Sequence, residues 1–369
     1  MNDYKHEETK LFDRFSSLIQ KRDSLGRNLV GARQEITAPF GWFRYKEAFS
    51  RDLVTDLLNE LDVKEGCLLD PFAGVGTACF AAAEAGLSAT AVEIMPLGVE
   101  IMETRRDATL YARDLTSSVL SWWADNQPWE ESGEVISFPH LNLTSGQFSE
   151  EVERKIGRFL YNISSIRDET TRRVLRLALM DSLEPVSFAL RDGQYLRKNA
   201  HLITRGGKLR KTIAPFSEML VKRLRRMAFD LVNVNELTAS SWSRITILNE
   251  SSLDLLANPS SDLPGAPFSA VITSPPYLNR YDYTRNYALE LALLGLSEFD
   301  VLGLRQRLLT CTVENREKSL HGPIVDEADK LLNEQHLFTM ICADLERQKP
   351  KVLLIIILSP AWFVTTSES

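Results

Sequence analysis

Residues 67–77 of the chain read CLLDPFAGVGT, an apolar run that ends in an acid and a glycine turn. The alanine-rich run Ala78–Ala85 predicts a helix that Gly86 closes, and Ser88–Glu93 predicts a second buried strand. A strand, a turn, a helix and another strand in so short a stretch form a compact βαβ unit. The sequence therefore predicts an α/β fold built on a parallel sheet.

The glycine turn is suited to hold a nucleotide-like cofactor. Gly74 and Gly76 let the backbone turn sharply and approach a ligand without interference from a Cβ atom. Glu93, at the end of the next predicted strand, is placed to reach a ribose hydroxyl. Cys79 stands where the dinucleotide fingerprint has its third glycine, and no Gly-Lys-Ser/Thr follows as in a P-loop. A purely structural tight turn is the competing interpretation, and the βαβ context together with Glu93 favours the cofactor.

A second string, Ser274-Pro-Pro-Tyr277, directly follows the predicted strand Phe268–Thr273. Two consecutive prolines cannot continue a hydrogen-bonded ladder, so the strand ends there. They project Ser274 and Tyr277 into the crevice where open α/β sheets bind ligands. A proline-stiffened strand exit without function is the alternative, and it loses weight once the string is paired with the glycine turn.

Both strings resemble motifs of the S-adenosylmethionine-dependent amino-methyltransferases of DNA. Asp70–Thr77 resembles motif I, which holds the cofactor, and Ser274–Tyr277 resembles the catalytic motif IV. Weaker resemblances link Asp254 to the cofactor adenine and the aromatic segment 40–50 to motif X. The resemblance assigns S-adenosylmethionine to Phe49, Asp70, Pro71, Phe72, Gly74, Gly76, Thr77, Glu93 and Asp254, and catalysis to Ser274, Pro275, Pro276 and Tyr277.

The residue types of the second string suit methylation of an exocyclic amine. The lone pair of such an amine is delocalised into the base, so acceptors for its N–H protons would favour a pyramidal, reactive nitrogen. The Ser274 hydroxyl and the Pro275 carbonyl can supply them, and Tyr277 can stack on a base flipped from double-stranded DNA. The expected transfer is direct and needs neither a metal nor a covalent intermediate.

Ser274 also bears on which base is methylated. In the resembling family, serine at this position is commonest in enzymes that make N4-methylcytosine, whereas Asp or Asn is commoner for N6-methyladenine. The prediction is a cytosine-N4 methyltransferase of a restriction-modification system, with a restriction endonuclease as partner. The alternatives are adenine-N6 methylation, RNA guanine-N2 methylation and a truncated, inactive relative that binds DNA or cofactor. C5-cytosine methylation is disfavoured, because no cysteine lies in a Pro-Cys context.

Charge is divided unevenly along the chain. The net charge is −7, yet residues 191–226 contain eleven Lys and Arg against two acids, Asp192 and Glu218. Such a stretch could grip phosphates, for example through Arg191–Arg197, or could be a solvated helix face. No apolar run reaches membrane length, no signal core is evident, and the four cysteines lack paired spacing. The composition predicts a cytoplasmic protein without membrane or metal partners.

The predicted architecture is a doubly wound, mostly parallel Rossmann-like sheet with a mainly helical insertion. Residues 1–35 form a helical segment, 36–100 and 244–369 the methyltransferase domain, and 101–243 the insertion, which would recognise the DNA target. Ser50 is expected to cap a helix over 51–61, and further helices are expected over 172–183 and 215–234. The run Val352–Leu358 resembles a late strand of the sheet, after which so few residues follow that C-terminal strands are expected to be missing.

Overall fold

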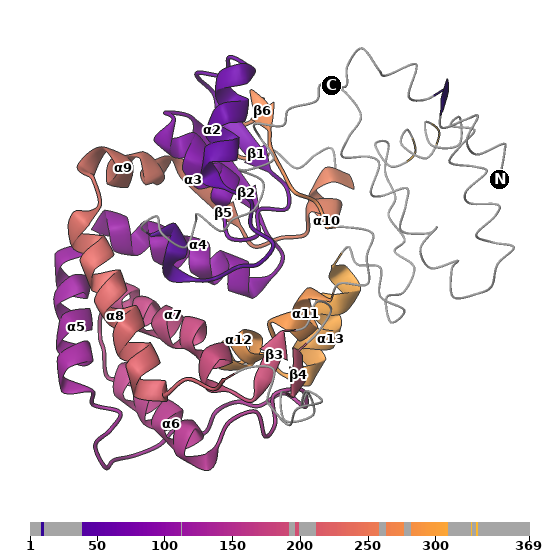
Figure 1. The fold of residues 1–369 in the computed structure, drawn as a ribbon. Helices are drawn as coiled ribbons and strands as arrows, with labels where there is room; N and C mark the ends of the chain where they lie inside the picture. The colour runs from indigo at the N-terminus through magenta and orange to yellow at the C-terminus, as the bar shows by residue number, and fades with distance from the viewer. Residues whose placement is uncertain are drawn as a thin grey trace, which may run out of the picture.

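The computed structural model describes residues 9–10, 39–111, 113–191, 196–198, 212–257, 263–276, 282–308, 326 and 330. Three predicted features lie outside the described residues: the segment 1–35 apart from 9–10, Tyr277, and the run Val352–Leu358. The described chain forms a sheet with helices packed on it and, beside this layer, a larger helical body (Figure 1).

Within the described residues, four parallel strands form the sheet in the order β5-β2-β1-β6. They are β1 (Cys67–Asp70), β2 (Ser88–Val92), β5 (Ile245–Leu248) and β6 (Ala270–Val271). All four residues of β1 are buried, as its apolar sequence predicts for a central strand. The predicted α/β fold with a mostly parallel, Rossmann-like sheet is confirmed.

The edge strand β6 is shorter than the predicted strand 268–273. Its backbone pairing with β1 ends where the Ile272 N–H donates to the Leu69 carbonyl at 3.2 Å. Pro275 and Pro276 follow almost at once, and neither has an N–H group with which to extend the ladder. The chain therefore leaves the sheet just before the serine of the proline string.

Three helices pack on or beside the sheet: α2 (Arg51–Glu60), α3 (Thr77–Glu84) and α4 (Pro96–Tyr111). The predicted cap of α2 is confirmed, because the Ser50 hydroxyl accepts a hydrogen bond from the Leu53 N–H at 3.1 Å. Nearly all of α3 is buried, since its alanines allow close approach to the strands. Phe80 of this helix meets the ring of Trp242 edge-on, with centroids 4.6 Å apart.

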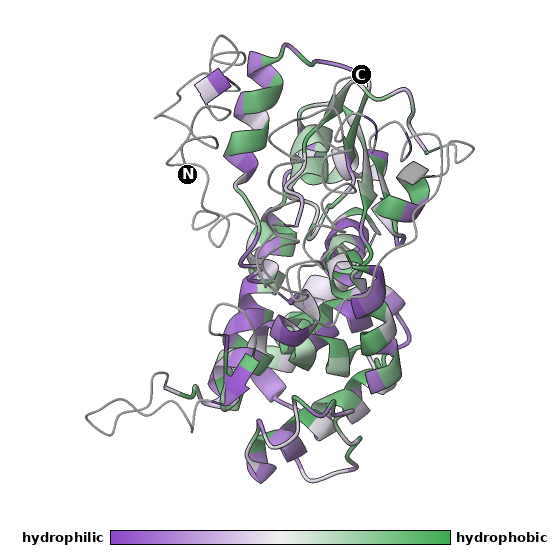
Figure 2. Ribbon diagram, turned by 90° about the vertical axis from the view of Figure 1, so that its right-hand side faces the viewer, coloured by the Kyte–Doolittle hydropathy of each residue, from purple (hydrophilic) through white to green (hydrophobic). Residues whose placement is uncertain are grey.

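The helical body holds the larger hydrophobic core. Its helices before β5 are α5 (Arg113–Asn126), α6 (Glu150–Ser164), α7 (Glu169–Val186) and α8 (Phe216–Asn233). The last two confirm the helices predicted over 172–183 and 215–234. Figure 2 shows hydrophilic and hydrophobic residues alternating along these helices, as expected for amphipathic helices whose apolar sides meet in a shared core.

The chain returns to this body after the proline string. The helices α11 (Tyr283–Asn286), α12 (Ala288–Leu293) and α13 (Glu298–Arg307) share the hydrophobic cluster of α5–α8. The antiparallel pair β3 (Ala189–Arg191) and β4 (Leu196–Lys198) lies beside them (Figure 1). The remaining short elements are 3₁₀ turns over Phe40–Trp42 and Trp242–Arg244, α9 (Glu236–Ser241) and α10 (Ser252–Ala257). None of the described helices has the length and apolar character that a membrane crossing requires.

Candidate active site

A pocket opens at the carboxyl ends of the sheet strands, where parallel α/β sheets bind ligands. It encloses about 860 Å³, part of it open to solvent, and residues that follow each of the four strands line it. Of the predicted site residues, the following line this pocket: Phe49, Pro71, Phe72, Gly74, Thr77, Glu93, Ser274 and Pro276. The structure thus brings the glycine turn and the proline string, some two hundred residues apart in the sequence, to one cavity.

Four predicted site residues that the structure describes do not line the pocket. Asp70 is buried beneath the glycine turn, Gly76 begins α3, and Pro275 lies between two residues that do line the pocket. Asp254 is exposed on α10, whereas its neighbours Ser251–Leu253 line the cavity. Tyr277 lies outside the described residues.

The glycine turn has the backbone geometry that its sequence predicts. Gly74 and Gly76 adopt positive φ angles of 54° and 83°, which side chains other than glycine rarely tolerate. A Cβ atom on Gly76 would also come within 2.7 Å of the Met102 sulfur. The turn therefore requires glycine at both positions, and it leaves the Gly74 N–H pointing to a carboxylate.

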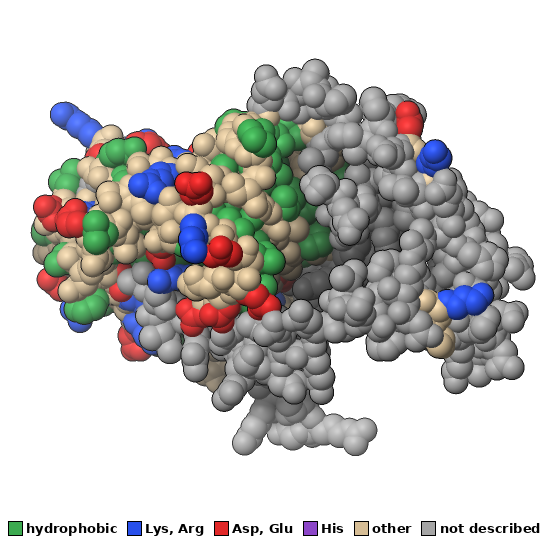
Figure 3. Space-filling view, turned by 90° about the horizontal axis from the view of Figure 1, so that it is seen from above, with side chains coloured by type: hydrophobic (Ala, Val, Ile, Leu, Met, Phe, Trp, Pro, Cys, Tyr) green, Lys and Arg blue, Asp and Glu red, His purple; other side chains and the backbone are tan. Residues whose placement is uncertain are grey.

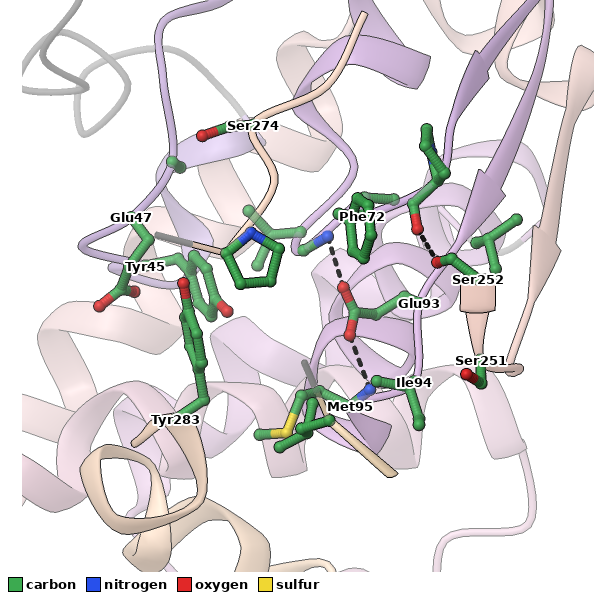
Figure 4. Close-up of a pocket in the computed structure, with 18 of the residues that line it drawn as sticks. Tyr45, Glu47, Phe72, Glu93, Ile94, Met95, Ser251, Ser252, Ser274 and Tyr283 are labelled. Atoms are coloured by element: carbon green, nitrogen blue, oxygen red, sulfur yellow. Dashed lines mark hydrogen bonds between the residues drawn. The ribbon is translucent and has the colours of Figure 1, made fainter. Parts of the chain in front are cut away.

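That carboxylate is Glu93, directly after β2. Its two oxygens accept hydrogen bonds from the Gly74 and Met95 N–H groups, each at 2.6 Å (Figure 4). Burial raises the pKa of Glu93 to about 7, although these two bonds oppose the shift. A carboxylate offers about four acceptor positions, so Glu93 can accept further hydrogen bonds from hydroxyl groups of a ligand in the pocket.

Asp70 lies beneath the pocket rather than in its lining, and its contact with the cofactor stays a prediction. It is fully buried, and its Oδ1 accepts the Phe72 N–H at 3.1 Å, which fixes the start of the turn. Burial raises the pKa of Asp70 to about 7, so near neutral pH its carboxyl group is only partly ionised. Its hydrogen bond with the Phe72 N–H holds the start of the turn from beneath.

Two ends of the pocket can be distinguished. In the view of Figure 4, one side holds Tyr45, Glu47, Ser274 and Tyr283, called the serine end below. The other side holds Glu93, Ser251 and Ser252, called the glutamate end. The serine end carries tyrosine rings beside its polar groups, whereas the glutamate end carries a desolvated carboxyl group. The two ends therefore suit two different ligands.

Sequence reasoning missed several of these residues. Tyr45 and Glu47 belong to the same aromatic segment as the predicted Phe49, and Tyr283 follows the proline string. Their closeness in sequence to predicted site residues is the signal that could have identified them. The Ser252 hydroxyl donates to the Pro71 carbonyl, which joins the segment after β5 to the glycine turn. No local motif marks that contact.

Two residues of α4 support the glycine turn from behind. A Cβ atom on Gly98 would lie 2.3 Å from the Gly74 carbonyl oxygen, so only glycine permits this approach of the helix. The buried Arg105 donates to the Val75 carbonyl at 3.2 Å and to the Phe40 carbonyl at 2.7 Å. Burial lowers the pKa of Arg105 to about 9. Neither residue stood out in the sequence.

Several cations in the described part of the basic stretch 191–226 form ion pairs within the protein, and phosphate contact by this stretch stays a prediction. Arg191 is buried and forms an ion pair with Glu290. On α8, Arg223 pairs with Asp181 at 2.6 Å and Arg225 with Asp125 at 3.2 Å. Figure 3 shows basic and acidic side chains interspersed on the described part of the face seen there. Within the described ranges, no group of His, Cys, Asp and Glu side chains is arranged to hold a metal ion.

Comparison with known proteins gives a family. The chain is 39% identical over 348 residues to the Type II methyltransferase M.AvaI of Nostoc sp., which covers 92% of this chain and 71% of that protein. The protein of the same name from Anabaena variabilis gives the same values. The Type II methyltransferase M.BsoBI of Geobacillus stearothermophilus is 32% identical over 333 residues, covering 85% of this chain and 64% of that protein. No family model and no solved structure matches the chain. At this identity and coverage, the chain belongs to the type II methyltransferases.

Proposed function

We propose that this protein is a DNA methyltransferase that transfers a methyl group from S-adenosylmethionine to the N4 amine of cytosine. The observation that carries the proposal is the meeting of Ser274 and Glu93 in one pocket. Membership of the type II methyltransferases supports the reaction class, and the proline string supports the amine as acceptor. The relatives' names also support a role in restriction-modification, with a cognate endonuclease as partner.

The glutamate end of the pocket fits the proposed cofactor. Glu93 is buried, and burial raises its pKa. Its carboxylate retains free acceptor positions, so hydroxyl donors such as those of a ribose would compensate for its desolvation. Gly74 presents bare backbone to the cavity, and Phe72 and Ile94 add apolar walls for a ring system. When bound, the cofactor supplies an electrophilic methyl group.

The serine end is proposed to prepare the amine. The Ser274 hydroxyl oxygen and the Pro275 carbonyl accept the two N–H protons of the base, which localises the lone pair on nitrogen and stabilises the charge that develops there. The two prolines hold both acceptors rigidly, because neither backbone can rotate freely about φ. Tyr277 is proposed to stack on the flipped base.

The domain division is proposed as the sequence indicates it, with one qualification from the packing. The insertion 101–243 would recognise double-stranded DNA, and the segments 36–100 and 244–369 would form the methyltransferase domain. Residues 282–308 nevertheless share the hydrophobic cluster of the insertion. The part of the chain that recognises DNA would therefore be packed directly against the catalytic part.

The experiment that tests the function identifies the product. The protein is incubated with S-adenosylmethionine and unmethylated genomic DNA or total RNA, the nucleic acid is digested to nucleosides, and the methylated species is identified by mass spectrometry. We expect N4-methyldeoxycytidine. N6-methyldeoxyadenosine would move the assignment to adenine, N2-methylguanosine to RNA, and cofactor binding without any product would indicate an inactive relative.

Ser274→Ala tests the catalytic assignment in the same assay. We expect turnover to fall by about a hundredfold or more, the usual loss when one group that stabilises developing charge is removed. The affinity for S-adenosylhomocysteine, measured by calorimetry, should stay within about twofold, because Glu93 and the glycine turn hold the other end of the pocket. Equal loss of turnover and affinity would show that Ser274 is structural.

A further inference from the structure

The aromatic segment, residues 40–49, connects the pocket to the helical body. Tyr45, Glu47 and Phe49 of this segment line the pocket. The backbone directly before Tyr45 is bonded to the helical body, where the Arg44 N–H donates to the Asp181 carboxylate of α7 at 3.1 Å. The packing of the aromatic segment on the helical body therefore sets the position of one pocket wall.

Tyr287, between α11 and α12, joins the helical body to this segment through several contacts. Its hydroxyl donates to the Glu47 carboxylate at 2.6 Å and accepts the Lys46 N–H at 3.3 Å. Its ring stacks on the ring of Tyr45 with centroids 4.9 Å apart and an interplanar angle of 5°. The side chain is fully buried, so it does not itself reach solvent or the pocket lining.

Tyr287 is in turn fixed by the strand pair of the insertion. The guanidinium of Arg191, the last residue of β3, lies 4.7 Å from the centroid of the Tyr287 ring. Arg191 is held by an ion pair with Glu290 and by a hydrogen bond from its Nε to the Asn286 carbonyl at 3.0 Å. The Lys46 ammonium closes the assembly by donating to the Arg191 carbonyl at 3.1 Å.

The consequence for the pocket follows from where Tyr45 and Glu47 lie. Both belong to the serine end, and the Tyr45 ring also lies 3.5 Å from the position that a Cβ on Gly74 would take. The stacked ring of Tyr287 thus supports the wall that packs on the glycine turn, while its hydroxyl orients the carboxylate near Ser274. One side chain thus acts on the carboxylate of the serine end and, through Tyr45, on the glycine turn, by two separable contacts.

We propose that Tyr287 is a positioning residue for methyl transfer: it fixes Glu47 and Tyr45 at the serine end and links them, through Arg191, to the strand pair of the helical insertion. The inference rests on the proposed function, since it assigns the serine end to the base that receives the methyl group. The proposal predicts that the hydrogen bond from the Tyr287 hydroxyl to Glu47 and the stacking of its ring on Tyr45 contribute separately, so that substitutions can remove them one at a time.

The test uses two variants and a control in the full-length protein. Tyr287→Phe keeps the stacked ring and removes the hydrogen bond to Glu47, whereas Tyr287→Leu removes both. Trp129→Phe is the control, because Trp129 is equally buried and loses one hydrogen bond, to Ser217, within the helical body and away from the pocket. The kcat for DNA methylation, the calorimetric affinity for S-adenosylhomocysteine and the melting temperature are measured for each variant.

We expect Tyr287→Phe to lower kcat about tenfold, as for loss of one hydrogen bond to a carboxylate, with the affinity for S-adenosylhomocysteine kept within about twofold. Tyr287→Leu should lower kcat further and also weaken S-adenosylhomocysteine binding about tenfold. Trp129→Phe should melt at a lower temperature yet change neither quantity. A merely structural role of Tyr287 would make the losses follow the melting temperature in all three variants.

The outcomes separate this inference from the proposed function. If the wild type methylates DNA and both Tyr287 variants behave like Trp129→Phe, the positioning role is overturned and the function stands. If the wild type binds S-adenosylhomocysteine without methylating DNA, the proposed function fails, and the loss of affinity in Tyr287→Leu still decides the positioning of the pocket wall. Unchanged affinity in that variant would overturn it.

Discussion

We expect the substitution Gly98→Ala in α4 to displace the glycine turn, against which this helix packs. Gly98 lies in the first turn of α4, and a Cβ atom there would stand 2.3 Å from the Gly74 carbonyl oxygen and 2.9 Å from the Glu93 Cγ. Ordinary carbon–oxygen contact begins roughly 1 Å farther out. The carbonyl of Gly74 or the whole start of α4 must therefore shift by about that distance.

The opposing terms can be compared. Alanine in place of glycine favours a helix by about 1 kcal/mol, and overpacking costs about 1–3 kcal/mol. The net change in stability is therefore small, but the displaced atoms belong to Gly74 and Glu93, the two residues that the hydrogen bond from the Gly74 N–H to Glu93 Oε2 joins in the pocket wall. We expect the affinity for S-adenosylhomocysteine to fall at least tenfold, which corresponds to about 1.4 kcal/mol.

The assay is calorimetric titration with S-adenosylhomocysteine beside thermal melting. Gly303→Ala is the matched control, because Gly303 also lies within a helix, α13, and a Cβ atom there would meet nothing within 4 Å. The control should bind as the wild type does and melt at the same or a slightly higher temperature. Wild-type affinity in Gly98→Ala would refute the reasoning that α4 fixes the turn through bare backbone.

Three further predictions concern Glu93 and the support of the glycine turn. Burial raises the pKa of Glu93 from 4.5 to about 7, so affinity for S-adenosylhomocysteine should increase between about pH 6 and pH 8 as the carboxylate forms, and Glu93→Gln should bind weakly without this pH dependence. Because the pKa of Glu93 is raised in the folded state, its contribution to the stability of the ligand-free fold is fully present below about pH 4.5 and is lost as pH rises through about 7. The melting temperature of Glu93→Gln should therefore fall less than that of the wild type between these two pH values. Arg105→Lys, which cannot reach the Val75 and Phe40 carbonyls together, should lower the free energy of unfolding by about 2 kcal/mol in denaturant titrations; an unchanged midpoint would contradict the clamp.

Local sequence was sufficient for the elements that depend on neighbouring residues. The βαβ unit of Cys67–Val92 follows from apolar runs, alanines and glycines whose conformational preferences are intrinsic. The cap at Ser50 and the early end of the edge strand before Pro275 have the same local origin. These features made the fold class predictable and placed two strings at the carboxyl edge of the sheet.

Longer-range features could not be found in this way. Asp254 matched a motif by position, yet the helix of which it is part leaves it exposed while Ser251–Leu253 face the pocket. Arg191 counted as a free cation in the basic stretch, yet packing places Glu290 beside it. A sequence pattern records the type and spacing of residues, whereas burial and ion pairing depend on which distant segment is packed alongside.

Turn chemistry and hydrophobic periodicity act over a few residues, so the glycine turn, the proline string and the parallel sheet that presents them could be predicted from local sequence. Packing between distant segments, by contrast, places Tyr45 and Glu47 in one pocket with Ser274 and brings Gly98 and Arg105 against the turn. The same packing buries Glu93 and raises its pKa to about 7. These outcomes depend on how the helical body packs against the aromatic segment. Desolvation and close contact are properties of that packing, and no short stretch of chain encodes them alone.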